Sequence, residues 1–231
     1  ANVTGVALPP NTSPSLFKLL DMENKVRTFY CDIRHSSALN NVVRKCDPEI
    51  VIHQAAQALV RDSYRDPLCT HSTNIMGSVN LLESLRDLNS VKVVIMVTTD
   101  KVYRNDGAPS GYSENDTLGG NDPYSASKAA SEIIISSYRK SFFEQRGVAI
   151  ATARAGNVIG GGDWSRERLL PDIIRNLNDT QKLKIRSPEA VRPWQHVLEP
   201  VNGYLMLAEK LWKQPESAGP YNFGPNFSDI K

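Results

Sequence analysis

One stretch of the chain holds a phenol and an amine at a spacing that suits acid–base chemistry. In NDPYSASKAASE, residues 121–132, Tyr124 precedes Lys128 by four positions. Asp122 and Pro123 predict a helix start here, and on that helix the two side chains would share one face, about a turn apart. A tyrosine has a pKa of about 10 in water, and a neighbouring ammonium favours the phenolate. The pair is a candidate base for an alcohol, although the same spacing also occurs on solvated helices.

A second polar stretch follows an apolar run. VTTDKVY, residues 97–103, places Thr99, Asp100 and Lys101 directly after a run of Val, Ile and Met. Strand ends are often polar, so a solvated strand end is one interpretation. Four successive hydrogen-bonding side chains at the tip of an apolar strand also indicate a site.

The pattern of elements that must position these side chains is that of an α/β sheet. Short β-branched runs alternate with longer amphipathic runs, which is typical of a parallel sheet wrapped by helices. The run at 93–97 lacks alternation, as expected of a central strand covered on both faces. Glycine and proline become dense later, so we predict a sheet domain at 1–155 and part of a substrate domain at 156–231. The expected strands span 2–8, 27–31, 49–53, 91–98 and 148–154, and the expected helices span 36–46, 71–88, 123–145 and 167–178.

The sequence lacks one feature of dinucleotide-binding sheets. Such a sheet opens with a strand, a Gly-rich turn and a helix whose N-terminus holds the pyrophosphate. Here the first run reads as a second strand, and no G-x-G-x-x-G precedes it. The glycines at 156 and 160–162 fit a substrate loop better than a phosphate cradle. Either the fold binds no nucleotide, or the chain is a fragment that lacks its start.

Composition excludes several classes of protein. The 231 residues carry a net charge of +2 with both signs interspersed, so we expect no nucleic-acid partner. No apolar run reaches the length of a membrane span, and because no basic start precedes an apolar core we expect no signal peptide. The three cysteines are widely spaced, which predicts reduced thiols, a cytoplasmic location and no metal site.

Several motifs together resemble a known family. They are CDIR at 31–34, HQAAQ at 53–57, STNIMGSVNLLES at 72–84, TTDKVY at 98–103, YSASK at 124–128, RAGNVIGGGDW at 154–164 and RPWQHVLEP at 192–200. They resemble the extended short-chain dehydrogenase/reductase family of NAD-dependent epimerases and dehydratases. Lys101 makes the likeness greatest for CDP-glucose 4,6-dehydratases, since dehydratases acting on dTDP-glucose have Glu there. The resemblance implies a doubly wound, mostly parallel Rossmann-like sheet, lacking its first strand, in a fragment that also lacks the C-terminal portion.

The resemblance implies a lyase reaction and a role for each catalytic residue. Tyr124, assisted by Lys128, takes a proton from the hydroxyl on sugar carbon 4 while hydride passes to NAD. Water is then lost across carbons 5 and 6, and the hydride returns to carbon 6. Thr99 donates a hydrogen bond to the carbon 4 oxygen, and Asp100, if burial raises its pKa, protonates the departing hydroxyl. Lys101 is either the base at carbon 5, which we favour, or a fixed positive charge.

The resemblance also implies which residues bind the NAD cofactor. Asp32 would reach the adenine and Ile33 would pack on its ring. Asn74 either orders the lysine through water or has a capping or packing role. The choice of NAD over NADP depends on the resemblance alone. The full predicted set is Asp32, Ile33, Ala55, Ala56, Gln57, Asn74, Thr99, Tyr124 and Lys128.

The predicted substrate residues lie later in the chain. Asn157 would face the sugar diphosphate of CDP-glucose, and His196 would position the substrate. Arg168 and Arg192 are candidates for the diphosphate charges, because guanidinium groups match phosphate oxygens bidentately. A surface salt bridge is the alternative for each arginine.

Two other functions remain open from the sequence. An epimerase or reductase of the same family would keep Tyr124 and Lys128 but would not need Asp100 with Lys101. A cofactor-binding regulator would keep the fold without turnover. The resemblance further implies a homodimer or higher homo-oligomer, assembled through the helices at 71–88 and 123–145.

Overall fold

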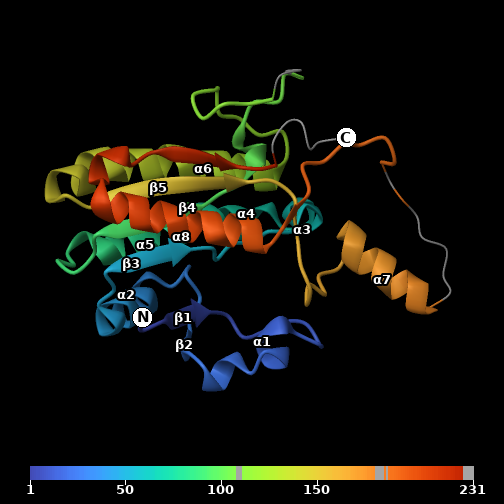
Figure 1. Cartoon of the computed structure of the whole chain (residues 1–231), viewed down its shortest axis with the longest axis horizontal. Coiled ribbons are helices and arrows are strands. Elements are labelled where there is room, and N and C mark those ends of the chain that lie inside the picture. Colours follow the sequence, from blue (N-terminus) through green and yellow to red (C-terminus); the bar gives the residue numbers. More distant parts are fainter. Residues whose placement is uncertain (108–110, 180–184, 186, 226–231) are drawn as a thin grey trace.

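A parallel sheet runs through the centre of the protein (Figure 1). The computed structural model describes residues 1–107, 111–179, 185 and 187–225. Within them, the sheet has the strand order β3-β4-β5-β8, and every neighbouring pair is parallel. Its strands are β3 (Ile50–His53), β4 (Val93–Val97), β5 (Ala149–Ala155) and β8 (Pro220–Phe223).

Two further strands pair with each other beside this sheet. Strands β1 (Thr4–Ala7) and β2 (Arg27–Tyr30) form a parallel ladder of their own, which lies below β3 in Figure 1. In the described residues no pairing joins β1 to β3. All five strands expected from the sequence are therefore present, and the parallel α/β class is confirmed.

Helices cover both faces of the central sheet, which explains the uninterrupted apolar run of β4. Val93 and Ile95 face the helix α8 (Leu198–Lys213), where they pack with Leu207 and Leu211. Val94 and Met96 face the other way and pack in a cluster with Leu82 and Leu85 of α5 (Gly77–Arg86) and with Leu39 of α2 (Ser36–Cys46). Because side chains alternate along a strand, a strand covered on both faces must be apolar at every position.

Two of the expected long helices form as successive helical segments. Residues 67–86 comprise α4 (Pro67–His71), a π-helical turn (Ser72–Met76) and α5. Residues 123–146 comprise α6 (Pro123–Tyr138), a π-helical turn (Arg139–Phe143) and a 3₁₀ turn (Glu144–Arg146). π-Helical turns inside helices are rare and occur often at functional sites.

Several elements were not expected from the sequence. They include α8 and β8, which add a helix layer and a strand to the central sheet. The sheet thus extends into residues that the sequence analysis assigned to a substrate region. Gly203 in α8 is a poor helix former, but a Cβ there would lie 2.5 Å from the Phe223 ring. The other unexpected elements are α1 (Leu16–Leu19), α3 (Val60–Arg65), β6 (Val158–Ile159), β7 (Gln195–His196) and the 3₁₀ turns Met22–Asn24, Asp100–Val102 and Pro215–Ser217.

The remaining helix, α7 (Leu169–Asp179), stands away from the central sheet in Figure 1. It follows the glycine-rich segment after β5 and matches the expected helix at 167–178. Among the residues that the structure describes, no helix combines the length and apolar character needed to cross a membrane. The same residues contain no group of three or more His, Cys, Asp or Glu placed to hold a metal ion.

Candidate active site

Helix α6 presents Tyr124 and Lys128 toward the carboxyl end of β4. Asp122 caps the helix as predicted, since its Oδ1 accepts a 2.9 Å hydrogen bond from the Ser125 amide, and Pro123 takes the first position. Tyr124 and Lys128 are both buried, at 9% and 7% exposure. The Lys128 Nζ donates a 3.0 Å hydrogen bond to the carbonyl oxygen of Val97, the last residue of β4. A helix and a strand tip thus form one site.

The residues after β4 complete this site. Thr99 is buried, and its Oγ1 donates a 3.1 Å hydrogen bond to Asp100 Oδ1. The Thr99 side chain also hydrogen-bonds to the Tyr124 phenol. A Cβ on Gly156, just after β5, would lie 3.4 Å from Asp100 Oδ2, so the absence of a side chain there leaves room at the carboxylate. Three segments that are distant in sequence meet at one edge of the sheet.

Burial has the largest effect on the acid–base state of Tyr124. Burial raises the pKa of Tyr124 above 10, with the Thr99 hydrogen bond and the Arg168 charge acting in the opposite direction. Desolvation of the phenolate outweighs the Arg168 charge, and the effect of the Lys128 ammonium on the phenolate stays a prediction. Phenolate formation therefore requires further positive charge at the site.

Asp100 has the environment that a proton donor needs. Burial raises the pKa of its carboxyl above the ordinary value, against the Thr99 hydrogen bond and the charges of Lys101 and Arg192. A carboxyl that keeps its proton closer to neutral pH can act as a general acid. The burial that this role requires is present in the structure.

Lys128 and His53 form a second buried titratable pair. Burial lowers the pKa of Lys128 to about 8, although the Glu132 carboxylate acts in the opposite direction. Burial, together with the nearby Lys128 ammonium, lowers the pKa of His53 at the end of β3 to about 3. The His53 ring is therefore neutral wherever the protein is folded near neutral pH, and Lys128 carries the positive charge.

This burial of His53 predicts acid sensitivity. The histidine pKa is about 3 in the folded protein, against an ordinary 6.5. The unfolded chain therefore binds the proton first, and stability is lost as the pH falls below 6.5. We expect His53 to lower the free energy of unfolding by about 2 kcal/mol when the pH falls from 7.5 to 5. Urea denaturation of wild type and His53→Gln at both pH values measures the difference.

His35→Gln, at an exposed position, is the control for that comparison. It should show the same loss of stability as wild type at pH 5. An equal loss in wild type and His53→Gln would contradict the prediction, because it would place the acid sensitivity elsewhere.

The predicted cofactor residues lie after the carboxyl ends of β2 and β3. Asp32 is held by Arg34, whose Nη2 lies 2.6 Å from Asp32 Oδ2, and this hydrogen bond lowers the pKa of the Asp32 carboxyl. Ile33 is 7% exposed and belongs to the core cluster, where a Cβ on Gly77 would lie 2.4 Å from its Cδ1. Its predicted contact with an adenine ring is thus limited to a small exposed edge. Ala55 and Ala56 are half-buried after β3.

Asn74 joins the β3 loop to helix α6. Its Oδ1 accepts a 2.8 Å hydrogen bond from the Gln57 amide, and its Nδ2 donates to the Gln57 carbonyl at 3.0 Å and to Ser127 Oγ at 2.8 Å. Both amide hydrogens of Asn74 are therefore in use. This geometry favours the packing alternative over the ordering of Lys128 through water. The π-helical turn that carries Asn74 places its side chain between the two elements.

Three of the predicted substrate residues lie in or beside the segment RPWQH, and the fourth, Arg168, forms a salt bridge. Asn157 lies beside RPWQH, because its carbonyl accepts a 2.9 Å hydrogen bond from the Gln195 amide and β6 pairs with β7. Arg192 is exposed beside Asp100, while His196 is exposed and its Nδ1 accepts from the Leu198 amide at 3.3 Å. Arg168 forms the salt bridge that was the alternative for it, with Nη1 3.3 Å from Asp163 Oδ2, and its charge also acts on Tyr124.

Lys101 is exposed on the 3₁₀ turn that follows Thr99. A role as base requires a neutral amine, which desolvation would favour. The exposed position provides little desolvation, so the geometry favours a fixed positive charge next to Asp100.

The sequence analysis missed a buried polar network behind Lys128. Glu132 and Arg154 form an ion pair at 2.8 Å, with side chains 4% and 3% exposed, and Thr98 and Thr152 hydrogen-bond to the same carboxylate. One signal was available. Glu132 follows Lys128 by four residues on the same helical face, and Arg154 is a charged residue in a mostly apolar strand.

Comparisons with known proteins agree with this arrangement. The sequence profile of the NAD dependent epimerase/dehydratase family matches residues 3–224. A CDP-glucose 4,6-dehydratase from Salmonella typhimurium is 46% identical to this chain, across 100% of the chain and 66% of the relative. A dTDP-D-glucose 4,6-dehydratase from Dictyostelium discoideum is 29% identical, across 85% of the chain and 45% of the relative.

Solved structures show the same fold. A double mutant of dTDP-glucose 4,6-dehydratase from Streptomyces venezuelae, with NAD bound, superposes with a TM-score of 0.75 at 26% identity, covering 90% of this chain and 61% of that protein. A UDP-glucuronic acid 4-epimerase from Bacillus cereus has a TM-score of 0.83 at 21% identity, covering 97% of this chain and 70% of that protein, a likeness of fold alone. The chain spans under two thirds of the length of the first relatives that it matches. From its sequence and its fold, this chain belongs to the NAD dependent epimerase/dehydratase family.

Proposed function

We propose that the protein of which this chain forms part is an NAD-dependent CDP-glucose 4,6-dehydratase. The observation that carries the proposal is the meeting of Thr99, Asp100 and Tyr124 at one edge of the sheet. A phenol, a hydroxyl and a half-buried carboxyl are the groups needed to deprotonate one sugar hydroxyl and to protonate another as it leaves. The identity of 46% to a CDP-glucose 4,6-dehydratase supports the choice of substrate.

The groups that follow β2 and β3, together with Lys128, fit a dinucleotide. Asp32 offers a carboxylate after β2, and two small residues, Ala55 and Ala56, allow close approach after β3. The Lys128 ammonium has three hydrogens. It donates one to the Val97 carbonyl oxygen, and the other two are available for a ligand. When bound, NAD supplies an acceptor for hydride that later gives the hydride back. These residues, with Gln57, would hold it.

Each residue then has a defined task. Tyr124 removes the proton from the hydroxyl on carbon 4. The single hydrogen of the Thr99 hydroxyl turns from Asp100 to the same sugar oxygen. Lys128 and Arg168 supply positive charge that favours the phenolate. Asp100, whose pKa burial raises, gives a proton to the hydroxyl leaving carbon 6. The proton of carbon 5 passes to water on the exposed side of the site, where Lys101 stabilises the negative charge that develops on the sugar.

The partners follow from the same proposal. Asn157, Arg192 and His196 would contact the sugar diphosphate, and Arg168 would join them on exchanging Asp163 for phosphate. The three cysteines are free thiols, which supports the cytoplasm as the location. Assembly as a homodimer or higher homo-oligomer through α5 and α6, and division of the chain at residue 155, stay predictions.

Product analysis tests the function. The complete protein is incubated with CDP-glucose, and in parallel with dTDP-glucose and UDP-glucose. We expect CDP-glucose to lose water and give a 4-keto-6-deoxy sugar that absorbs in alkali, faster than the other two substrates. An isomer formed without loss of water would mean an epimerase, and binding without turnover would mean a regulator. Either result would overturn the proposal.

A further inference from the structure

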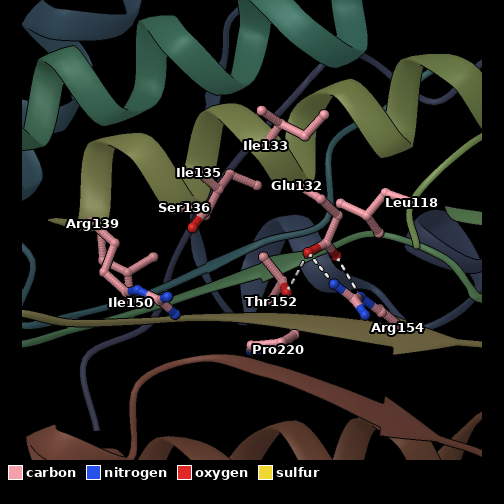
Figure 2. A pocket seen from close by; sticks show the side chains of 10 residues that line it. All are labelled: Leu118, Glu132, Ile133, Ile135, Ser136, Arg139, Ile150, Thr152, Arg154 and Pro220. Carbon is pink, nitrogen blue, oxygen red and sulfur yellow. Dashed lines mark hydrogen bonds and ion pairs between the residues drawn. The ribbon is translucent and has the colours of Figure 1, made fainter. Parts of the chain in front are cut away.

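Glu132 lies at the centre of a saturated set of hydrogen bonds. Its Oε1 accepts from Thr98 Oγ1 at 2.5 Å and from Arg154 Nε at 3.0 Å. Its Oε2 accepts from Thr152 Oγ1 at 2.8 Å and from Arg154 Nη2 at 2.8 Å. A carboxylate accepts about four hydrogen bonds. Figure 2 shows this pair at the wall of a cavity of about 260 Å³ between α6, β5 and β8.

The bonded partners of Glu132 are neighbours of the candidate catalytic residues. Thr98 directly precedes Thr99 and Asp100. Glu132 itself follows Lys128 by four residues and Tyr124 by eight, so all three share one face of α6. The single carboxylate therefore joins the helix that carries the phenol and amine to the segment after β4 that carries the hydroxyl and the proton donor.

The network continues through Arg154 to the far side of the site. Its Nη1 donates to Tyr103 Oη at 2.9 Å and to the Glu114 carbonyl at 3.1 Å. The Tyr103 hydroxyl in turn donates to Asn222 Oδ1 of β8 at 2.6 Å. The turn that carries Asp100 and Lys101 is thus held between Thr98 at its start and Tyr103 at its end.

A buried ion pair is a poor source of stability, because apolar side chains of similar size often do as well. Hydrogen bonds, however, fix both the distance and the direction between two elements, whereas apolar contacts let the elements shift against each other. Ala129 and Ile135 supply such apolar contacts on α6. This contrast indicates that the network serves geometry.

We propose that Glu132 is a positioning residue, whose carboxylate sets helix α6 against the tip of β4 and so fixes Tyr124 and Lys128 relative to Thr99. The inference rests on the proposed dehydratase function. Thr98, Thr152 and Arg154 share this positioning role, because they hydrogen-bond to the same carboxylate.

The first test removes one hydrogen bond and keeps the ion pair. In the complete protein, Thr98→Val keeps the side-chain shape and loses the hydroxyl, while Thr98→Ser restores it. We expect Thr98→Val to lower kcat at least about tenfold with little change in KM, because small displacements of reacting groups are costly. Thr98→Ser should recover most of the rate. Ser136→Ala, on the same helix and lining the same cavity, should leave kcat unchanged.

Two results of these measurements would contradict the proposal. A lowered melting temperature of Thr98→Val with an unchanged kcat would reduce the network to a structural role and overturn the proposal. So would a loss in Thr98→Ser as large as in Thr98→Val, since the hydroxyl would not be the cause.

A second test needs no turnover. In protein labelled at lysine Cε, NMR follows the titration of Lys128, which faces Glu132 on its own helix and His53 on β3. Glu132 acts to raise the pKa of Lys128, so Glu132→Gln should move the midpoint to lower pH, while Ser136→Ala should not. An unmoved midpoint would overturn the coupling of Glu132 to Lys128. A wild type with no dehydratase activity would instead contradict the proposed function, and this titration would still test the coupling of Glu132 to Lys128.

Discussion

Replacing Tyr124 with phenylalanine is expected to lower the kcat of the complete dehydratase about a thousandfold. The change removes the one oxygen that accepts the proton of the sugar hydroxyl and keeps the ring that fills the site. The loss of one buried hydrogen bond to Thr99 costs about 1–3 kcal/mol of stability, and the ring that stays keeps the packing, so the main effect should be on chemistry. Alkaline absorbance of the 4-keto product gives kcat and KM, and thermal unfolding checks the fold.

Tyr138→Phe is the matched control for this variant. Tyr138 lies at the end of the same helix, and its hydroxyl hydrogen-bonds to Glu83 at 2.8 Å on the surface. The same chemical change there should leave kcat near the wild-type value. A Tyr124→Phe enzyme within a few-fold of wild type would show that another group takes the proton.

Breaking the Glu132–Arg154 pair from one side is expected to destabilise the fold by about 3–5 kcal/mol. Arg154→Met leaves a carboxylate buried at 4% exposure with only two hydroxyl donors, from Thr98 and Thr152. Replacing both partners with methionine removes both charges. The double variant should therefore recover much of the lost stability, which urea denaturation measures.

The exposed pair of Lys213 and Glu209 on α8 provides the control. Glu209→Ala should give no measurable change, because solvent screens that pair. A contrary result would be an Arg154→Met variant that loses as little stability as Glu209→Ala. That result would mean that the Glu132 carboxylate is protonated or bonded to another group, and that the ion pair does not stabilise the site.

Much of the fold and part of the site could be predicted because their signals are local. The β-branched runs predict the five early strands, and Asp122 with Pro123 predicts the start of α6 at the residue where it occurs. The four-residue spacing of Tyr124 and Lys128 puts both on one helical face. Capping, propensity and periodicity depend on residues within one or two turns, so a single sequence contains them in full.

Only the tertiary structure decided which polar groups meet and what burial does to them. Ile33 enters the core beside Gly77, Arg154 bonds to Glu132 across 22 residues, and Tyr103 bonds to Asn222 across 119. Burial raises the pKa of Tyr124 against the Thr99 hydrogen bond and the Arg168 charge, and both of these residues lie far from Tyr124 in sequence. Such contacts and desolvation depend on how elements distant in sequence pack together, which local patterns do not encode. Residue types therefore determined the chemistry available to this protein, and packing decided which of those groups share an environment in which to use it.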